Sequence, residues 1–150
     1  MTNIPLSESA RKVLEQAQHE ARALNQEFVG TEHLFLAVLQ TSGTHAQRIL
    51  RAHHVDRDAV RSQLLTFLPI GENEPVVTGA LPLSPKAQRA LQSALVMSRS
   101  LREPKLSTRV LLISLMDEPK TALIQALRNS GVDVDGLLRA LAEKPEDDEA

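Results

Sequence analysis

A tandem repeat constrains the fold of this 150-residue chain more than any other feature. Leu6-Ser7 and Leu83-Ser84 begin two segments that align without a gap at an offset of 77 positions. The identical pairs are mostly apolar or helix-start residues: Ala10 and Ala87, Leu14 and Leu91, Ala17 and Ala94, Arg22 and Arg99, Leu24 and Leu101, Thr31 and Thr108, Leu34 and Leu111. Such self-similarity indicates one supersecondary unit used twice, with both copies packed on a shared core.

Each repeat predicts four helices. Apolar residues recur at spacings of three and four, which is the period of a helix with one buried face, and no segment shows the alternation of a strand. The residues predicted to cap or open the helices are Ser7, Glu32, Thr44 and Asp56 in the first repeat and Ser84, Arg109, Thr121 and Asp133 in the second. Gly131 follows the third helix of the second repeat and can adopt the left-handed conformation. We therefore predict an all-α fold of two tandem four-helix repeats with pseudo-twofold symmetry.

The predicted organisation is one domain over residues 1–150. Repeat one covers 4–67, repeat two covers 83–143, and an ordered or semi-flexible connector rich in proline and glycine covers 68–82. Residues 144–150 form an acidic stretch that is either a solvated tail or the start of a linker.

Composition argues against several classes of protein. No apolar run approaches the roughly 20 residues of a membrane span, and no secretory signal or cysteine is present, so we expect a soluble cytoplasmic protein without membrane contact. A net charge of −2, with three Phe and no Trp or Tyr, argues against nucleic-acid binding.

No motif supports catalysis. The five histidines lack metal-ligand spacing and are interpreted as ordinary surface or helix-end residues. The chain contains no Gly-x-Ser-x-Gly elbow, no cysteine nucleophile and no phosphate-binding Gly-x-x-x-x-Gly-Lys-Ser/Thr loop. We therefore predict no catalytic residue, no metal, no cofactor and no ATPase activity in this chain.

The sequence Gly30-Thr31-Glu32-His33 allows two interpretations. In the first, Thr31 caps the second helix, Glu32 complements its dipole by about 0.3–1 kcal/mol, and Gly30 permits a tight turn into it. In the second, the Glu32 carboxylate receives a cationic group while neighbouring helix-start amides receive an anion. The residues alone leave both open.

The stretch "LSESARKVLEQAQHEARALNQEFVGTEHLFLAVL" resembles the first repeat of the N-terminal domains of Clp AAA+ unfoldases, most of all the ClpC type. The resemblance covers about residues 4 to 143. It implies an eight-helix domain that sits on a hexameric Clp ATPase ring, receives protein substrates and adaptor proteins, and passes substrates to the ClpP peptidase.

Some ClpC-type domains recognise phosphorylated arginine. The resemblance implies that Glu32 would hold the guanidinium, with Thr31 and the helix start around Ser7 assisting the phosphate. In the second repeat the equivalents are Ser84, Thr108 and Arg109. Arg109 replaces a carboxylate by a guanidinium, so a second pocket is expected to prefer acidic groups or to bind nothing.

Two functions follow from this resemblance. The first is a non-catalytic substrate- and adaptor-binding domain of a Clp system, acting in cis or in trans with the ring and recognising arginine-phosphorylated proteins through the first repeat. The alternative is a stand-alone regulatory or scaffold protein that docks on partners without reading a phosphoryl mark.

Overall fold

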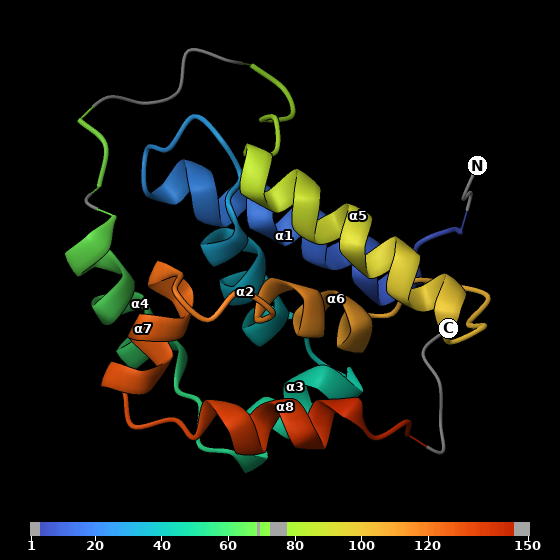
Figure 1. The fold of residues 1–150 in the computed structure, drawn as a ribbon. Helices are drawn as coiled ribbons and strands as arrows, with labels where there is room; N and C mark the ends of the chain where they lie inside the picture. Colours follow the sequence, from blue (N-terminus) through green and yellow to red (C-terminus); the bar gives the residue numbers. More distant parts are fainter. Residues whose placement is uncertain (1–3, 69, 73–77, 146–150) are drawn as a thin grey trace.

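The computed structural model describes residues 4–68, 70–72 and 78–145, and these residues contain helices and no strand (Figure 1). The helices are α1 (Glu8–Ala23), α2 (Thr31–Gln40), α3 (His45–Ala52), α4 (Arg57–Phe67), α5 (Pro85–Ser100), α6 (Thr108–Leu115), α7 (Ala122–Asn129) and α8 (Val134–Ala142). The all-α prediction is confirmed. Residues 69 and 73–77 of the predicted connector and 146–150 of the predicted tail lie outside the described residues.

Side-chain caps begin six helices where the sequence predicts them. In each, a hydroxyl or carboxylate oxygen accepts a hydrogen bond of 3.0–3.3 Å from the backbone N–H three residues later. The capping residues are Ser7, Thr44, Asp56, Ser84, Thr121 and Asp133. The starts of α2 and α6 differ from prediction: α2 begins at Thr31 after Gly30, and α6 begins at Thr108 after Ser107, which caps it.

The backbone repeats as the sequence does. Asn25 and Arg102 have positive φ, and so do His54 and Gly131, and each pair is separated by the same 77 positions as Leu6 and Leu83. These residues follow α1, α5, α3 and α7, where a left-handed residue ends a helix by reversing the chain. The predicted left-handed conformation of Gly131 is confirmed, with φ of 82°.

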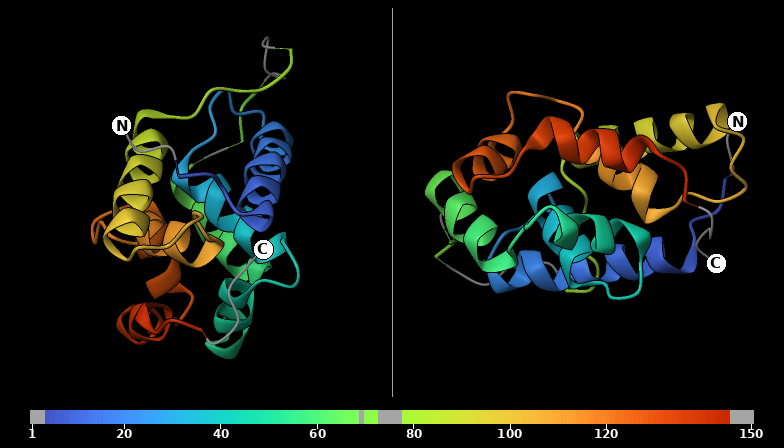
Figure 2. Two further views of the ribbon diagram at one scale, coloured as in Figure 1. Left: turned by 90° about the vertical axis from the view of Figure 1, so that its right-hand side faces the viewer. Right: turned by 90° about the horizontal axis from the view of Figure 1, so that it is seen from below.

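The core lies around α2 and α6. In the views of Figures 1 and 2, α1 and α5 lie on one side of these two helices, α3 and α8 lie on the opposite side, and α4 packs on α7 at one end. Every side chain from His33 to Val38 is buried, and Phe35 is the largest fully buried one among the described residues. The α4–α7 and α3–α8 contacts join the two repeats, so the repeats share one core.

Backbone hydrogen bonds cross between the repeats at both ends. Val29 N–H donates to Pro82 O at 2.9 Å and Ser84 N–H donates to Val29 O at 2.8 Å. At the other end, Ser7 N–H donates to Leu106 O at 2.9 Å and Leu106 N–H donates to Pro5 O at 2.9 Å. Each repeat therefore begins beside the segment that leads into the second helix of the other repeat.

The Phe35→Ala variant is expected to lose about 3–5 kcal/mol of unfolding free energy, because it leaves a cavity in a fully packed core. Phe67→Ala is the matched control, since Phe67 is 43% exposed. Urea denaturation measures both. Equal losses in the two variants would contradict the placement of the core around α2.

Candidate functional site

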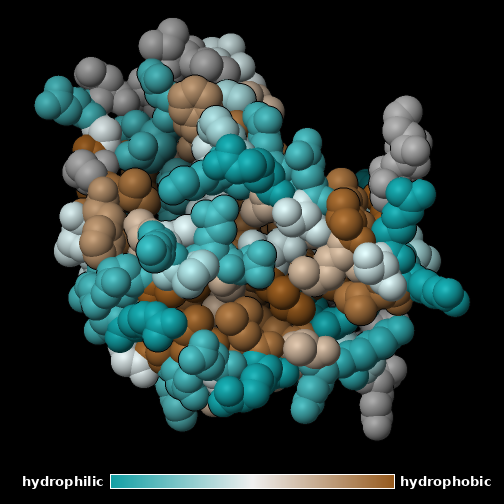
Figure 3. Space-filling model, viewed as in Figure 1, coloured by the Kyte–Doolittle hydropathy of each residue, from teal (hydrophilic) through white to brown (hydrophobic). Residues whose placement is uncertain are grey.

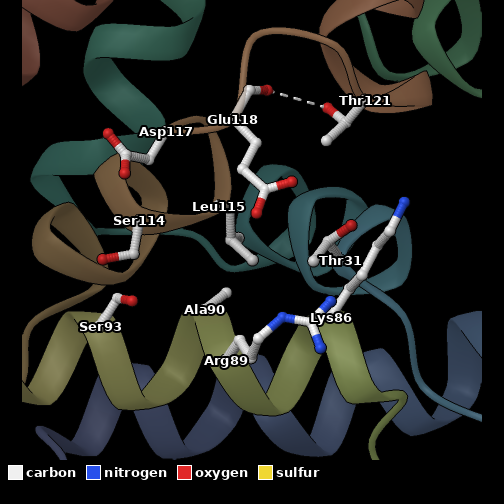
Figure 4. Close-up of a pocket in the computed structure, with 10 residues that line it drawn as sticks. All are labelled: Thr31, Lys86, Arg89, Ala90, Ser93, Ser114, Leu115, Asp117, Glu118 and Thr121. Carbon is white, nitrogen blue, oxygen red and sulfur yellow. Dashed lines mark hydrogen bonds between the residues drawn. The ribbon is translucent and has the colours of Figure 1, made fainter.

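A pocket at the start of α2 takes its walls from both repeats. One part is lined by Thr31, Glu32, Leu68, Ser84, Pro85, Lys86, Arg89, Thr121, Ala122 and Leu123. The adjoining part, drawn in Figure 4, is lined by Thr31, Lys86, Arg89, Ala90, Ser93, Ser114, Leu115, Asp117, Glu118 and Thr121. Because the two parts share four residues, we treat them as one site, called the charged pocket below.

One side of the charged pocket favours anions. The first turns of α2, α5 and α7 all contribute lining residues, and the free N–H groups and dipole of a helix start attract negative charge. Lys86 and Arg89 project from the first turns of α5 along the same wall (Figure 4). Neither pairs with a carboxylate among the described residues, so both cations are available to a ligand.

Carboxylates supply the opposite charge. Glu32 lies in the first turn of α2, and its side chain is 21% exposed. Asp117 and Glu118 follow α6, and the Glu118 carboxylate points toward α5 and Thr31 in Figure 4. The pocket can therefore meet a cationic and an anionic group of one ligand at the same time.

The Glu32 carboxylate folds back over Gly30. A Cβ atom on Gly30 would lie 2.3 Å from Glu32 Oε1, and the Thr31 hydroxyl donates to Glu32 Oε2 at 3.4 Å. Gly30 has φ −96° and ψ 177°, an extended conformation that any residue adopts. The expectation that Gly30 serves a tight turn is therefore wrong: the missing side chain makes room for the carboxylate.

His33 replaces Thr31 in holding the start of α2. Its Nδ1 accepts a hydrogen bond of 2.8 Å from Gly30 N–H, whereas Thr31 is the first helical residue and does not cap. Of the two positions expected for the histidines, surface or helix end, His33 occupies the helix end, and its side chain is buried. Burial lowers the pKa of His33 from its ordinary 6.5, against the opposing effect of the Glu32 and Glu20 carboxylates. The neutral imidazole, with Nδ1 as acceptor, fits this arrangement.

The structure separates Ser7 from Glu32 and brings Ser84 beside it. Ser7 is buried, caps α1, and is hydrogen-bonded to Leu106 of the second repeat. Ser84, predicted as part of a second site, lines the charged pocket together with Thr31 and Glu32. The sequence expectation that the helix start around Ser7 would lie near Glu32 is not what the fold produces, because the repeats exchange their starts.

Thr108 and Arg109, two of the second-repeat equivalents, are closed off. The Arg109 guanidinium is buried and donates to Glu103 Oε1 and to Leu141 O, both at 2.8 Å. Thr108 is fully buried. The second repeat therefore has no exposed Arg109 guanidinium that could bind an acidic group.

Sequence reasoning missed Lys86, Arg89, Glu118 and Thr121 as pocket residues. The available signal was the pair of cations three residues apart in the first turns of α5. That spacing places both on one helix face, but only the fold shows that this face lies beside Glu32.

Other classes of site find no support in the described residues. Residues 4–68, 70–72 and 78–145 hold no group of three or more metal-ligating side chains. Within the same ranges, no helix is both long enough and apolar enough to cross a bilayer.

The lowered pKa of His33 predicts a stability that depends on pH. The unfolded chain takes up a proton at His33 below about pH 6.5, whereas the folded chain does so only at a lower pH. The free energy of unfolding therefore falls as the pH drops from 6.5 to the pKa of His33 in the folded chain. In His33→Gln the amide oxygen can still accept from Gly30 N–H, and this part of the pH dependence disappears. Denaturation curves from pH 5 to 8 measure it. Identical pH profiles for the two proteins would contradict the buried neutral imidazole.

The Glu103→Ala variant is expected to lose about 3–5 kcal/mol, because it leaves the buried Arg109 charge without its partner. A double variant in which Glu103 and Arg109 both become Met should recover part of this loss, since no unpaired charge remains. Thermal or chemical denaturation of the two variants measures the difference. A single variant as stable as the parent chain would show that the ion pair is not buried.

Comparison with known proteins identifies the family. Residues 5–130 and 82–147 match the model of the Clp repeat (R) N-terminal domain. The chain is 31% identical over 131 residues to the ClpA homolog of Porphyra purpurea, named an ATP-binding subunit of the ATP-dependent Clp protease, with 87% of this chain and 16% of that protein covered. It is 30% identical over 127 residues to the chloroplastic chaperone protein ClpC1 of Arabidopsis thaliana, with 85% and 14% covered. The matched part of the chain thus spans only 14–16% of the length of these relatives.

Solved structures share the fold at low sequence identity. The N-terminal domain of the Clp-associated chaperone ClpD from Arabidopsis thaliana superposes with a TM-score of 0.76 at 18% identity, covering 94% of each chain. The ClpV N-domain, solved in complex with a VipB peptide, superposes with a TM-score of 0.67 at 18% identity, covering 91% of this chain and 84% of that one. With its eight described helices and its matching repeats, the chain belongs to the Clp repeat (R) N-terminal domain family.

Proposed function

We propose that this chain is a non-catalytic binding domain that receives protein substrates and adaptors for a Clp unfoldase, and that its charged pocket binds phosphorylated arginine. The observation that carries the proposal is the pairing of a carboxylate from one repeat with cations and helix starts from the other. Phosphoarginine has the matching chemistry, since a guanidinium and a phosphoryl group stand side by side.

Each group of phosphoarginine has a partner in this proposal. The guanidinium lies against the Glu32 carboxylate, whose partial exposure leaves oxygen lone pairs free. The phosphoryl group lies among the helix starts of α5 and α7, where Lys86 and Arg89 neutralise its charge. Ser84 takes the role expected for Ser7, because the fold places Ser84 and not Ser7 beside Glu32.

The comparisons support a peptide-binding role. One protein of the same fold, the ClpV N-domain, was solved with a bound VipB peptide. Relatives with sequence similarity are named as ATP-binding subunits of the Clp protease and as a chaperone. A Clp ATPase ring and the ClpP peptidase are the partners we propose. The cytoplasmic location stays a prediction, since relatives such as ClpC1 are named chloroplastic.

A second candidate function is binding to partner proteins without recognition of phosphoarginine. Here the chain is a regulatory or scaffold protein whose helical faces bind partners directly. The buried Arg109 favours this second candidate function. It stands at the position equivalent to Glu32 and is paired internally with Glu103, so the second repeat has no second pocket for phosphoarginine. A stable protein partner combined with no response to phosphoarginine would establish this candidate.

Calorimetric titration with phosphoarginine, arginine and inorganic phosphate tests the first proposal. Phosphoarginine should bind at least about tenfold more tightly than either fragment, because only it meets both halves of the pocket. The Glu32→Ala variant should lose at least about tenfold in affinity for phosphoarginine while keeping its helix content. Glu27→Ala is the matched control, because Glu27 is exposed and does not line the pocket.

The Gly30→Ala variant separates the position of the carboxylate from its charge. The new methyl group would displace the Glu32 carboxylate, yet the extended backbone at Gly30 accepts alanine without strain. Affinity for phosphoarginine should change while thermal stability stays close to that of the parent chain. Unchanged affinity in both Glu32→Ala and Gly30→Ala would remove Glu32 from the site.

A further inference from the structure

An apolar pocket adjoins the charged pocket along α5. It is lined by Arg89, Gln92, Ser93, Val96, Met97 and Ser100. Two of these residues, Arg89 and Ser93, also line the charged pocket, so the two hollows are continuous. Figure 3 shows apolar side chains exposed over the second half of α5.

The lining residues fall on one face of the helix. Lys86, Arg89, Ser93, Val96 and Ser100 follow one another at spacings of three and four, so they form a single stripe along α5. The first half of this stripe carries two cations, and the second half places Val96 between Ser93 and Ser100. We call residues 86–100 on this face the α5 stripe.

Val96 is the most exposed large apolar side chain among the described residues, at 61%. No described element covers it, although the same helix buries Ala87, Ala90 and Ala94 against the core. Its exposed area is therefore available to a ligand that continues out of the charged pocket.

Ser114 lies where the two halves of the stripe meet. This residue of α6 is 7% exposed and lines the charged pocket with Ser93. Its hydroxyl has no hydrogen-bond partner among the described residues. A buried hydroxyl without a partner costs free energy, and a backbone group of a bound chain could satisfy it.

We propose that the charged pocket and the α5 stripe together bind an extended segment of a substrate or adaptor protein. The phosphoarginine of this segment occupies the charged pocket, and an aliphatic side chain of the same segment covers Val96. This inference rests on the proposed function and adds a sequence requirement to it.

The spacing follows from the geometry of the helix. Val96 lies seven residues after Arg89 and ten after Lys86, which at 1.5 Å per residue is about 10–15 Å along α5. An extended chain advances about 3.3 Å per residue, so three to five residues cover that distance. The aliphatic residue should therefore stand three to five positions from the phosphoarginine, on one side of it only.

A peptide scan tests this requirement. The probes are Gly-Ser peptides with one central phosphoarginine and a single leucine moved through each position on both sides, with affinity measured by fluorescence anisotropy. Leucine at three to five positions on one side should tighten binding about fivefold, through partial burial of its side chain against Val96. Leucine next to the phosphoarginine should change little.

Two uncharged substitutions show where on the protein the gain in affinity from leucine arises. Val96→Ser should abolish the gain from leucine and leave the affinity of the leucine-free peptide within about twofold. Ile70→Ser is the matched control, because Ile70 is similarly exposed at 53% and lines neither pocket. No gain at any position, or a gain that persists in Val96→Ser, would overturn the inference.

The outcomes for the two proposals are distinguishable. If leucine tightens the binding of peptides that lack the phosphoryl group, the phosphoarginine proposal is wrong, whereas the binding of an aliphatic side chain to the α5 stripe is supported. Binding of the leucine-free phosphoarginine peptide alone would do the reverse. Sedimentation tests a further outcome. If the chain dimerises with rising concentration and Val96→Ser abolishes this, the α5 stripe binds a second copy of the chain and the proposal of a bound peptide segment is wrong.

Discussion

The arrangement of the charged pocket depends on the backbone hydrogen bonds between Val29 and the segment of Pro82 and Ser84. They bring the start of the second repeat against the segment that leads into α2. The first turn of α5, with its two cations, therefore stands beside the Glu32 carboxylate of the other repeat. Charges that are more than fifty residues apart in sequence meet in one pocket, and neither repeat could form that pocket alone.

The same exchange at the other end has the opposite result. There Ser7 lies against Leu106, but Arg109 stands where Glu32 stands in the first repeat, and Glu103 and the Leu141 carbonyl bind its guanidinium internally. A buried charge requires such partners, so the second end closes on its own ion pair, whereas the Glu32 side chain at the first end is partly exposed. The two ends of the symmetric frame thus differ, since Gly30, Glu32 and His33 of the first repeat correspond to Ser107, Arg109 and Val110 of the second.

Local patterns in the sequence predicted much of this structure. Helix caps such as Ser84 and Asp133 act within four residues, and the 77-position repeat indicated a shared helical core, so both were readable without a structure. The neighbours of Glu32 were not readable, because pairing across the repeats depends on long-range packing. The role of Gly30 was not readable either. Its backbone conformation is ordinary, and its missing side chain matters only because the Glu32 carboxylate folds back over it.

A heteronuclear NMR titration with phosphoarginine tests most directly whether the site is formed by both repeats. A site formed by both repeats predicts saturable shifts around Gly30–His33, around Ser84–Arg89 and at Thr121, and no shifts around Arg109. Shifts confined to Gly30–His33 and Ser7 would contradict it, because they would place the ligand between helix starts of the first repeat alone.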